Sequence, residues 1–253
     1  MYGRSLGRAI RLSCLFLGIL FLVIGGRSIW QEAEATQRYV ALAAEMSQPS
    51  SEGAEDATGG TDGSDENGVD WASLEEVNPD VVAWLRLDGT AIDTPVVQGD
   101  DNDYYLHYDF WGQLSYVGCA FADVRCDVDG DNVLVFQHRC TLGGGFSEIY
   151  AAWDEDVFDG MGTLHWSTPG LGTKDFEPLC CLRVDKRFAD IQQFSFSTDD
   201  EYEDWLRTLV AQASVVSDDA EELISGSTRA VTLSTCATVQ VGQRWRTLVV
   251  FVR

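Results

Sequence analysis

The stretch TLSTCATVQVGQRWRTLVVFVR, Thr232–Arg253, contains two strand-forming runs and the polar segment that joins them. The first run ends at Cys236, and the second begins at Arg246, ten residues later. β-Branched and apolar residues fill both runs, as expected for strands with buried faces. The stretch therefore predicts two strands at the end of the chain, and leaves open whether Cys236 is a reactive thiol or a core cysteine.

Six further runs of strand-forming residues precede this stretch. They are VVAWLRLDG (Val81–Gly89), IDTPVVQ (Ile92–Gln98), GCAFADV (Gly118–Val124), NVLVFQH (Asn132–His138), GTLHWSTPG (Gly162–Gly170) and FEPLCCLRVDKRF (Phe176–Phe188). Turn residues such as DGDN, at Asp129–Asn132, separate them. Short strands at this spacing predict a mainly β domain that closes, or nearly closes, into a barrel.

Helical signals in the same region are few. The clearest is STDDEYEDWLRTLVAQASV, where Ser197 or Thr198 can cap the helix, acids fill its first turn and apolar residues line one face. Short helical turns are also expected after Leu74 and within Gly144–Phe158. The domain is thus predicted to carry a few peripheral helices, one of them before the strand that ends at Cys236.

The first 30 residues differ in composition from the rest. Residues 1–11 form a basic head with three arginines, and residues 12–30 are largely apolar. Such a pattern is typical of a secretory signal or a signal anchor. Only AEA, at Ala33–Ala35, resembles a cleavage site, which favours an uncleaved transmembrane anchor. Three arginines before the run against Arg27 alone after it predict a cytoplasmic N-terminus and an extracellular domain.

Residues 31–70 are predicted to connect the anchor to the folded domain. Gln31–Gln48 is rich in Ala, Glu and Gln, which favours a helical stalk that continues the anchor. Pro49–Asp70 contains mainly Gly, Ser and acidic residues, which is typical of a flexible acidic linker. The folded domain is therefore expected to span residues 71–253.

The charge of the chain excludes one class of partner. Its 41 acidic and 17 basic residues give a formal net charge of −24. A surface this acidic repels phosphate backbones, so nucleic-acid binding is not expected. The hydrophobic fraction of 45% is sufficient for a sizeable core.

The seven cysteines form no CxxC motif, and Cys14 lies within the apolar run. A Cys119–Cys126 bridge is compatible with an exported domain but does not follow from the spacing. His138 and Cys140 are the only close pair that resembles zinc ligands, and a second pair is missing. We therefore expect no metal site.

Three side chains of different chemistry lie at the ends of predicted strands. Cys236 ends one strand, His138 ends another and Arg246 starts the last. A nearby cation favours the nucleophilic thiolate form of a cysteine, and an arginine is a permanent cation that can stabilise an oxyanion. Together the three would suffice for acyl transfer. Taken singly, each also has a structural interpretation, as a core thiol, a hydrogen-bonded histidine and a barrel-edge charge.

These residues resemble those of the class B sortases of Gram-positive bacteria. TLSTC at Thr232–Cys236 is similar to that family's active-site signature, and the arginine ten residues later is similar to its catalytic arginine. NVLVFQH, at Asn132–His138, resembles the strand that leads to the catalytic histidine. Asn78–Gly112 is similar to the family's entry segment, and the acidic helix in Asp199–Ala213 resembles the one that separates class B from housekeeping sortases. The resemblance covers residues 71–253.

The resemblance implies a sortase-type β-barrel and a membrane-anchored cysteine transpeptidase. Cys236 would attack the Thr carbonyl of a C-terminal sorting motif on an exported protein and form a thioacyl enzyme. His138 would protonate the leaving amine and later deprotonate the incoming one, and Arg246 would stabilise the oxyanion. The incoming amine would belong to a cell-wall precursor or a pilin. No metal or organic cofactor is implied.

Some site assignments stay open at this stage. Arg244 is an alternative to Arg246, because RWR offers two arginines on one face of a strand. Ser234 shares a face with Cys236 and is a candidate substrate contact, as is the adjacent Thr235.

The residues around His138 depart from the family pattern. Members usually carry Gly before the histidine, often as YGH, whereas Gln137 holds that place here. Arg139 and Cys140 follow where an amide or histidine and an apolar residue are commoner. Gln137 is expected to alter the setting of the imidazole, and Cys140 could pair with Cys236 as a regulatory disulfide.

Two other functions fit the same residues. A hydrolytic cysteine peptidase would resolve the acyl enzyme with water instead of an amine. A surface-interaction domain would keep the barrel with catalysis weakened by the unusual FQHRC segment, His138 included.

Overall fold

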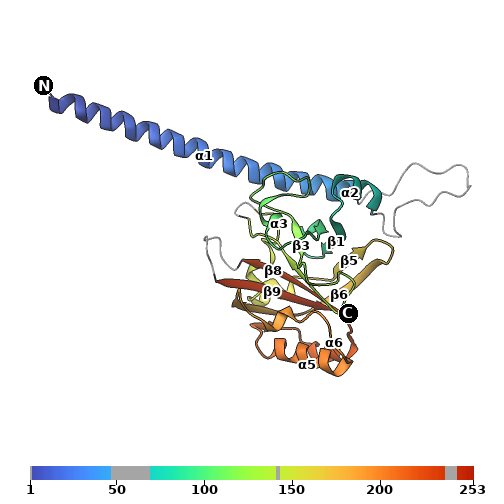
Figure 1. The fold of residues 1–253 in the computed structure, drawn as a ribbon. Coiled ribbons are helices and arrows are strands. Elements are labelled where there is room, and N and C mark those ends of the chain that lie inside the picture. Colours follow the sequence, from blue (N-terminus) through green and yellow to red (C-terminus); the bar gives the residue numbers. More distant parts are fainter. Residues whose placement is uncertain (1, 47–68, 141–142, 237–243) are drawn as a thin grey trace, which may run out of the picture.

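The computed structural model describes residues 2–46, 69–140, 143–236 and 244–253, without the side chains of residues 2–12 and of Cys236 (Figure 1). Most of the predicted acidic linker, Pro49–Asp70, lies outside the described residues.

Eight strands of the described chain close into a barrel. In spatial order they are β5 (Leu164–Thr168), β1 (Val81–Leu87), β2 (Asp93–Val97), β3 (Ala120–Ala122), β4 (Asn132–Phe136), β8 (Ala230–Cys236), β9 (Trp245–Val252) and β6 (Gly172–Asp185). Pairing of β5 with β6 closes the ring, and the short β7 (Val215–Val216) adds to β6. The pairs β2–β3 and β4–β8 are parallel, and the other pairs are antiparallel. The predicted mainly β barrel is confirmed.

Alternation along the strands fills the inside of the barrel. Leu85, Val135, Leu233, Val249 and Phe251 are fully buried in one cluster, and each comes from a run that the sequence marks as apolar. Side chains of neighbouring positions point to the opposite face of the sheet. Because several strands are apolar on both faces, the outer face also needs cover.

Helices provide that cover. They are α2 (Trp71–Val77), α3 (Tyr104–His107), α4 (Glu155–Asp159), α5 (Asp199–Val210) and α6 (Ala220–Gly226), with 3₁₀ turns η1 (Ile149–Ala151) and η2 (Asp190–Gln192). The Thr198 hydroxyl caps α5 by accepting the backbone N–H of Glu201. Trp205 and Leu206 of α5 pack in one cluster with Leu248 of β9. The predicted helix before the Cys236 strand is thus present, together with α6, which the sequence did not indicate.

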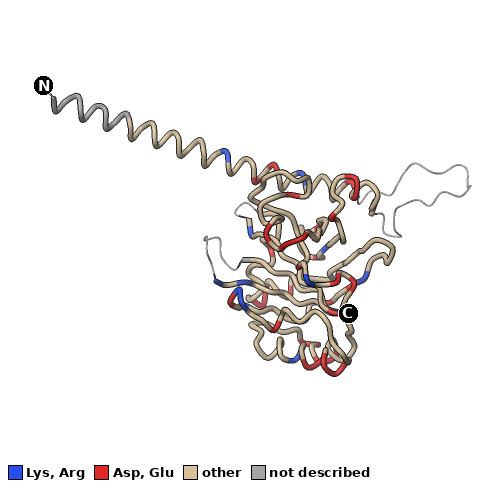
Figure 2. Tube along the Cα trace, viewed as in Figure 1, with Lys and Arg blue, Asp and Glu red and all other residues tan. Residues whose placement is uncertain are grey.

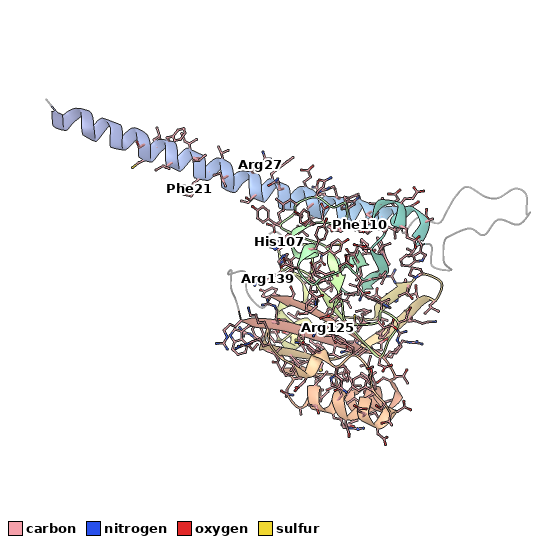
Figure 3. All side chains as sticks on the ribbon, viewed as in Figure 1. Phe21, Arg27, His107, Phe110, Arg125 and Arg139 are labelled. Atoms are coloured by element: carbon pink, nitrogen blue, oxygen red, sulfur yellow. The ribbon has the colours of Figure 1, made fainter. Side chains whose placement is uncertain are left out.

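The N-terminal helix α1 (Tyr2–Met46) has two different halves. From Ser13 to Trp30 its side chains are almost all exposed, and Ser13–Met46 is long and apolar enough to cross a membrane. Between Ser13 and Trp30, Arg27 is the only charged residue, and Figure 2 draws this part of the helix mostly in tan. Phe21 and Arg27 lie well away from the barrel (Figure 3).

The second half of α1 packs on the barrel beside β2. Ala35, Tyr39, Ala43 and Met46 are buried in a cluster with Phe110 and other residues of the 104–119 segment. These four positions are spaced at four, four and three residues, which places them on one face of the helix. One continuous helix therefore joins an exposed apolar segment to the folded domain.

Candidate active site

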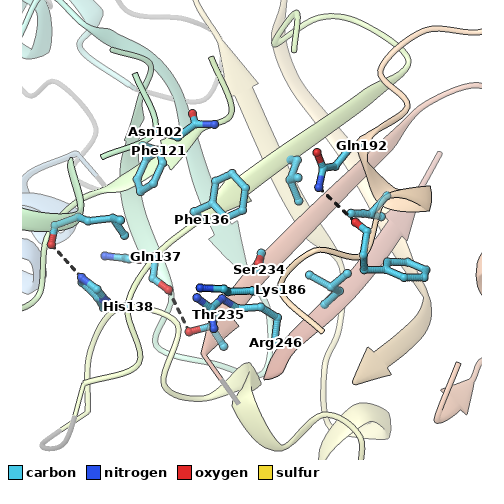
Figure 4. Close-up of a pocket in the computed structure, with 15 residues that line it drawn as sticks. Asn102, Phe121, Phe136, Gln137, His138, Lys186, Gln192, Ser234, Thr235 and Arg246 are labelled. Atoms are coloured by element: carbon cyan, nitrogen blue, oxygen red, sulfur yellow. Dashed lines mark hydrogen bonds between the residues drawn. The ribbon is translucent and has the colours of Figure 1, made fainter. Parts of the chain in front are cut away.

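A cavity of about 300 Å³ opens on the outer face of the sheet, where β4, β8 and β9 lie side by side (Figure 4). Its apolar lining comes from Leu106, Phe121, Leu134, Phe136, Phe188, Ile191 and Leu248. Its polar lining comes from Asn102, Gln137, His138, Lys186, Gln192, Ser234, Thr235 and Arg246. The structure thus brings four of the five predicted site residues into one cavity, and the fifth, Cys236, follows Thr235 directly.

The strand register places Cys236 opposite Arg246. These two residues are direct partners in the antiparallel pair β8–β9. Direct partners share a face and have Cα atoms about 4.5–5.5 Å apart. Arg246 lines the cavity, and Cys236 holds the position beside it on β8. The ten-residue spacing between them is therefore the separation of two facing positions along a strand pair.

Ser234 and Thr235 take different directions from β8. Ser234 lies on the same face as Cys236, two residues away. Thr235 is buried, and its hydroxyl donates to the carbonyl of Gln137 over 2.9 Å. That bond is drawn in Figure 4 and joins β8 to the residue before His138. The Thr235 hydroxyl thus supports the site from within the sheet.

His138 is held by a backbone carbonyl. Its Nε2 lies 2.8 Å from the carbonyl oxygen of Leu106, and because a carbonyl only accepts, Nε2 must carry the proton. In neutral His138, Nδ1 is then the nitrogen left to accept a proton. Burial lowers the pKa of His138, and the nearby charges of His107 and Arg246 lower it further, while the bond to Leu106 opposes them. The neutral imidazole is therefore favoured at pH 7.

The two candidate arginines have different surroundings. Arg246 lines the cavity, and its Nη1 donates to the carbonyl of Trp245 over 3.1 Å. Arg244 is exposed and binds Asp185 through Nε at 3.0 Å and Nη2 at 2.9 Å. Hydrogen bonds from the Arg187 backbone and from Arg244 lower the pKa of Asp185 to about 2. The geometry favours Arg246 as the arginine of the site.

Gln137 precedes His138 directly after the end of β4 and lines the same cavity. Its backbone N–H donates to the carbonyl of Ser234, which continues the β4–β8 pairing, and its side chain is buried. The side-chain Oε1 has no hydrogen-bond partner among the described residues. The amide carbon lies near Gly145, whose backbone φ of +52° favours glycine. The Gln137 side chain thus packs beside Gly145, in the segment whose Phe146 N–H donates to the His138 carbonyl.

The buried cysteines are free thiols. Cys119, Cys126 and Cys140 form no disulfide in this structure, so the Cys119–Cys126 bridge considered from the sequence is absent. Burial raises the pKa of Cys140 to about 12, which leaves it protonated at neutral pH. The described residues contain no group of histidines, cysteines and acids that could hold a metal ion.

Several residues that hold His138 or line the cavity could not be recognised from the sequence. The Leu106 carbonyl that holds His138 comes from a segment 32 residues upstream. Lys186 and Gln192 enter the cavity from the segment that follows β6. A backbone carbonyl can belong to any residue, and the loops that line a cavity have no periodic pattern.

Comparisons with known proteins agree on one family, although no family model matches the chain. The sortase B of Listeria monocytogenes serovar 1/2a is 30% identical over 179 residues, which is 70% of each chain. The crystal structure of Clostridium perfringens sortase B is 29% identical, with a TM-score of 0.63, and the match covers 72% of this chain and 97% of that one. The sortase B of B. anthracis in complex with AAEK1 has a similar fold, with a TM-score of 0.69, 24% identity and coverage of 88% and 98%.

Proposed function

The chain belongs to the sortase B family and is a sortase-type cysteine transpeptidase, and from that premise we propose that Cys236, His138 and Arg246 are its catalytic residues. We further propose that its substrates are exported proteins with a C-terminal sorting motif, joined to an amine of the cell wall or of a pilin. The observation that supports the assignment is the cavity lined by both His138 and Arg246, with Cys236 as the direct strand partner of Arg246.

The first half of the reaction forms an acyl enzyme. Cys236 gives its proton to Nδ1 of His138, and the sulfur attacks the carbonyl carbon of the motif. The carbonyl oxygen becomes an oxyanion, which the fixed positive charge of Arg246 stabilises. When the C–N bond breaks, the Nδ1 proton passes to the leaving amine, and the acyl group remains on sulfur as a thioester.

The second half reverses these roles. An incoming amine attacks the thioester carbonyl, and His138 removes a proton from its nitrogen. The Cys236 thiolate leaves and a new amide bond forms. In both halves the Leu106 carbonyl holds Nε2–H, so the imidazole can exchange a proton at Nδ1 without turning.

We propose that α1 anchors the enzyme in the cell membrane by a single pass, with the N-terminus in the cytoplasm and the barrel outside. Its projecting half leaves large apolar side chains such as Phe21 and Leu22 exposed, by 73% and 77%. A row of such side chains is unfavourable in water and suits the bilayer interior. Since the same helix continues into the packed half, the barrel would lie close to the membrane surface.

The decisive experiment traps the acyl enzyme. The purified protein is incubated with Thr-containing sorting peptides, with and without an added amine, and both enzyme and peptide are analysed by mass spectrometry. The expected result is a peptide adduct on Cys236 that disappears when the amine is added, with formation of an amide product. Cys236→Ala should give no adduct. A protein that yields only cleaved acid with every amine would contradict transpeptidation.

A further inference from the structure

Basic residues gather at one place on this acidic molecule. Of the 17 lysines and arginines in the chain, five lie in residues 183–187 and 244–246. The two segments pair with each other, since Val184 faces Arg246 and Asp185 faces Trp245 across β6–β9. Blue positions accordingly cluster at the edge of the barrel where β6 ends and β9 begins (Figure 2). The cluster is unusual for this chain, because acidic residues outnumber basic ones by 24.

Three of the five cations already have partners outside the cavity. Arg244 and Arg187 both bind the carboxylate of Asp185, at 2.9 and 3.2 Å. The guanidinium of Arg183 lies 5.4 Å from the centre of the Trp153 ring, on the opposite face of β6 from Val184. The other two, Lys186 and Arg246, line the cavity.

Lys186 has no evident structural role for its charge. Its backbone N–H donates to the carbonyl of Arg244, which fixes the start of the side chain beside β9. Its ammonium makes no ion pair with any residue that the structure describes. The ammonium and the Arg246 guanidinium therefore line one cavity without a carboxylate in its described lining. An anion that entered the cavity would relieve the repulsion between them.

The strand register sets how far this charge is from the reaction centre. Cys236, Arg246 and Val184 are neighbours in one row across β8, β9 and β6. Lys186 lies two residues beyond Val184, just past the end of β6, and its backbone N–H continues the pairing by donating to Arg244. With strands about 4.8 Å apart and about 3.3 Å per residue, the Cα atoms of Cys236 and Lys186 are about 12 Å apart. An extended peptide covers that distance in about four residues.

We propose that Lys186 is a specificity-determining residue that binds a carboxylate side chain of the sorting peptide within about four residues of the scissile bond. The inference rests on the proposed function and names a feature of its substrate. Phe188 and Ile191, which line the cavity with Lys186, contact the apolar part of the same peptide. Because the rest of the surface is strongly acidic, it repels a carboxylate held elsewhere, so the position of the acid in the peptide is selected.

The test is a positional library of fluorogenic peptides that carry one Thr. Each peptide has Asp or Glu, or the matching amide Asn or Gln, at one of four positions on either side of the Thr bond. The ratio of kcat/KM for acid over amide is measured for each position. At the preferred position we expect a ratio of about threefold to tenfold, as for a partly exposed ion pair. Raising the salt from about 0.05 M to about 0.5 M should reduce it.

Three variants assign that ratio to Lys186. Lys186→Gln should bring it close to one, and Lys186→Glu should favour the amide peptide. Lys174→Gln is the matched control, because Lys174 is the only other lysine and lies near the start of β6, whereas Lys186 follows the end of that strand; Lys174 does not line the cavity. It should keep the wild-type ratio. If Lys186→Gln and Lys186→Glu fail to fold, Lys186→Met replaces them, because it keeps the apolar stem of the side chain without the charge.

The outcomes separate this inference from the proposed function. Peptides that acylate Cys236 with no acid preference at any position would overturn the role of Lys186 and leave the proposed function intact. An acid preference that survives Lys186→Gln would do the same. The absence of a Cys236 adduct with every peptide of the library would overturn both.

Discussion

The two sides of the proposed active-site cavity are held by different kinds of interaction. On one side, His138 is fixed by a backbone carbonyl in a segment packed beneath α1. On the other side, Arg246 stands among exposed charges at the start of β9. Buried hydrogen bonds fix geometry because breaking one leaves a desolvated group without a partner, whereas exposed charges supply electrostatics at little structural cost. Buried hydrogen bonds thus fix the position of His138, whereas the side of the cavity at Arg246 supplies positive charge.

The histidine side depends on the N-terminal helix. The Tyr39 hydroxyl donates to the carbonyl of Gly118 over 2.8 Å and accepts the N–H of Phe110 over 3.0 Å. Gly118 has φ +64°, and a Cβ there would lie 2.6 Å from the Tyr105 carbonyl oxygen and 3.4 Å from Cδ2 of His138. The backbone at Gly118 therefore passes closely between α1 and the imidazole. The helix that we propose as the membrane anchor is also part of the support of the proposed active site.

The largest expected effect is on the arginine side. Arg246→Ala should lower kcat/KM for a sorting peptide by about 100- to 1,000-fold, as when a stabilising donor is removed from an oxyanion site. Arg246→Lys should recover part of it, since it keeps the charge without the planar guanidinium. Steady-state kinetics with a fluorogenic peptide measures both, and circular dichroism checks the fold. A loss of less than about fivefold for Arg246→Ala would exclude the oxyanion role.

Tyr39→Phe tests the histidine side. Removing the hydroxyl leaves the Gly118 carbonyl and the Phe110 N–H buried without a partner, so the free energy of unfolding should fall by about 1–2 kcal/mol. We also expect kcat to fall more than KM rises, because the histidine support moves. Chemical denaturation and peptide kinetics measure the two effects. Val40→Ala, at an exposed neighbour on the same helix, is the control and should change stability by less than about 0.5 kcal/mol.

One outcome of the Tyr39→Phe measurements would contradict a role of α1 in positioning His138. If Tyr39→Phe lowered stability but left kcat and its pH dependence unchanged, α1 would hold the domain together without positioning His138. If Tyr39→Phe lowered both kcat and the free energy of unfolding, the result would support a contribution of α1 to the position of His138.

The contrast between the two sides also explains what the sequence could predict. The Cys236–Arg246 pair was predictable, because strand periodicity and a ten-residue spacing can be recognised from the types of the residues alone. The support of His138 was not, because Leu106 and Gly118 act through carbonyl groups that every residue has. The docking of α1 was hidden for a related reason: Tyr39 is one aromatic residue in an Ala- and Glu-rich helix. Main-chain contacts over long separations leave little trace in a single sequence.

The pH dependence of stability tests the burial of His138. Its folded pKa is lowered below the ordinary value of about 6.5, so the unfolded chain binds a proton that the folded protein does not. Above pH about 6.5, His138 is neutral in both the folded and the unfolded protein, and its burial does not lower the free energy of unfolding. As the pH falls from there toward the folded pKa, only the unfolded chain takes up the proton, so the free energy of unfolding decreases. Denaturant midpoints between about pH 7.5 and pH 5 should show this loss, and His138→Gln should reduce it. An unchanged slope in the variant would mean that other groups cause it.

The smallest expected effect is at the exposed charges beside Arg246. Arg244→Ala removes both contacts of that guanidinium to Asp185, but the pair is exposed and solvent screens it, so the unfolding midpoint should not change measurably. Peptide kinetics should also stay within about twofold of wild type, because Arg244 does not line the cavity. The result separates the two arginines of RWR. If Arg244→Ala were as damaging as Arg246→Ala, then Asp185 would have to orient the start of β9, and the charged side of the cavity would depend on fixed geometry as much as the histidine side does. If Arg244→Ala changes neither stability nor kinetics, the catalytic effect belongs to the guanidinium of Arg246 alone. The surrounding cations would then affect only which peptides the site selects.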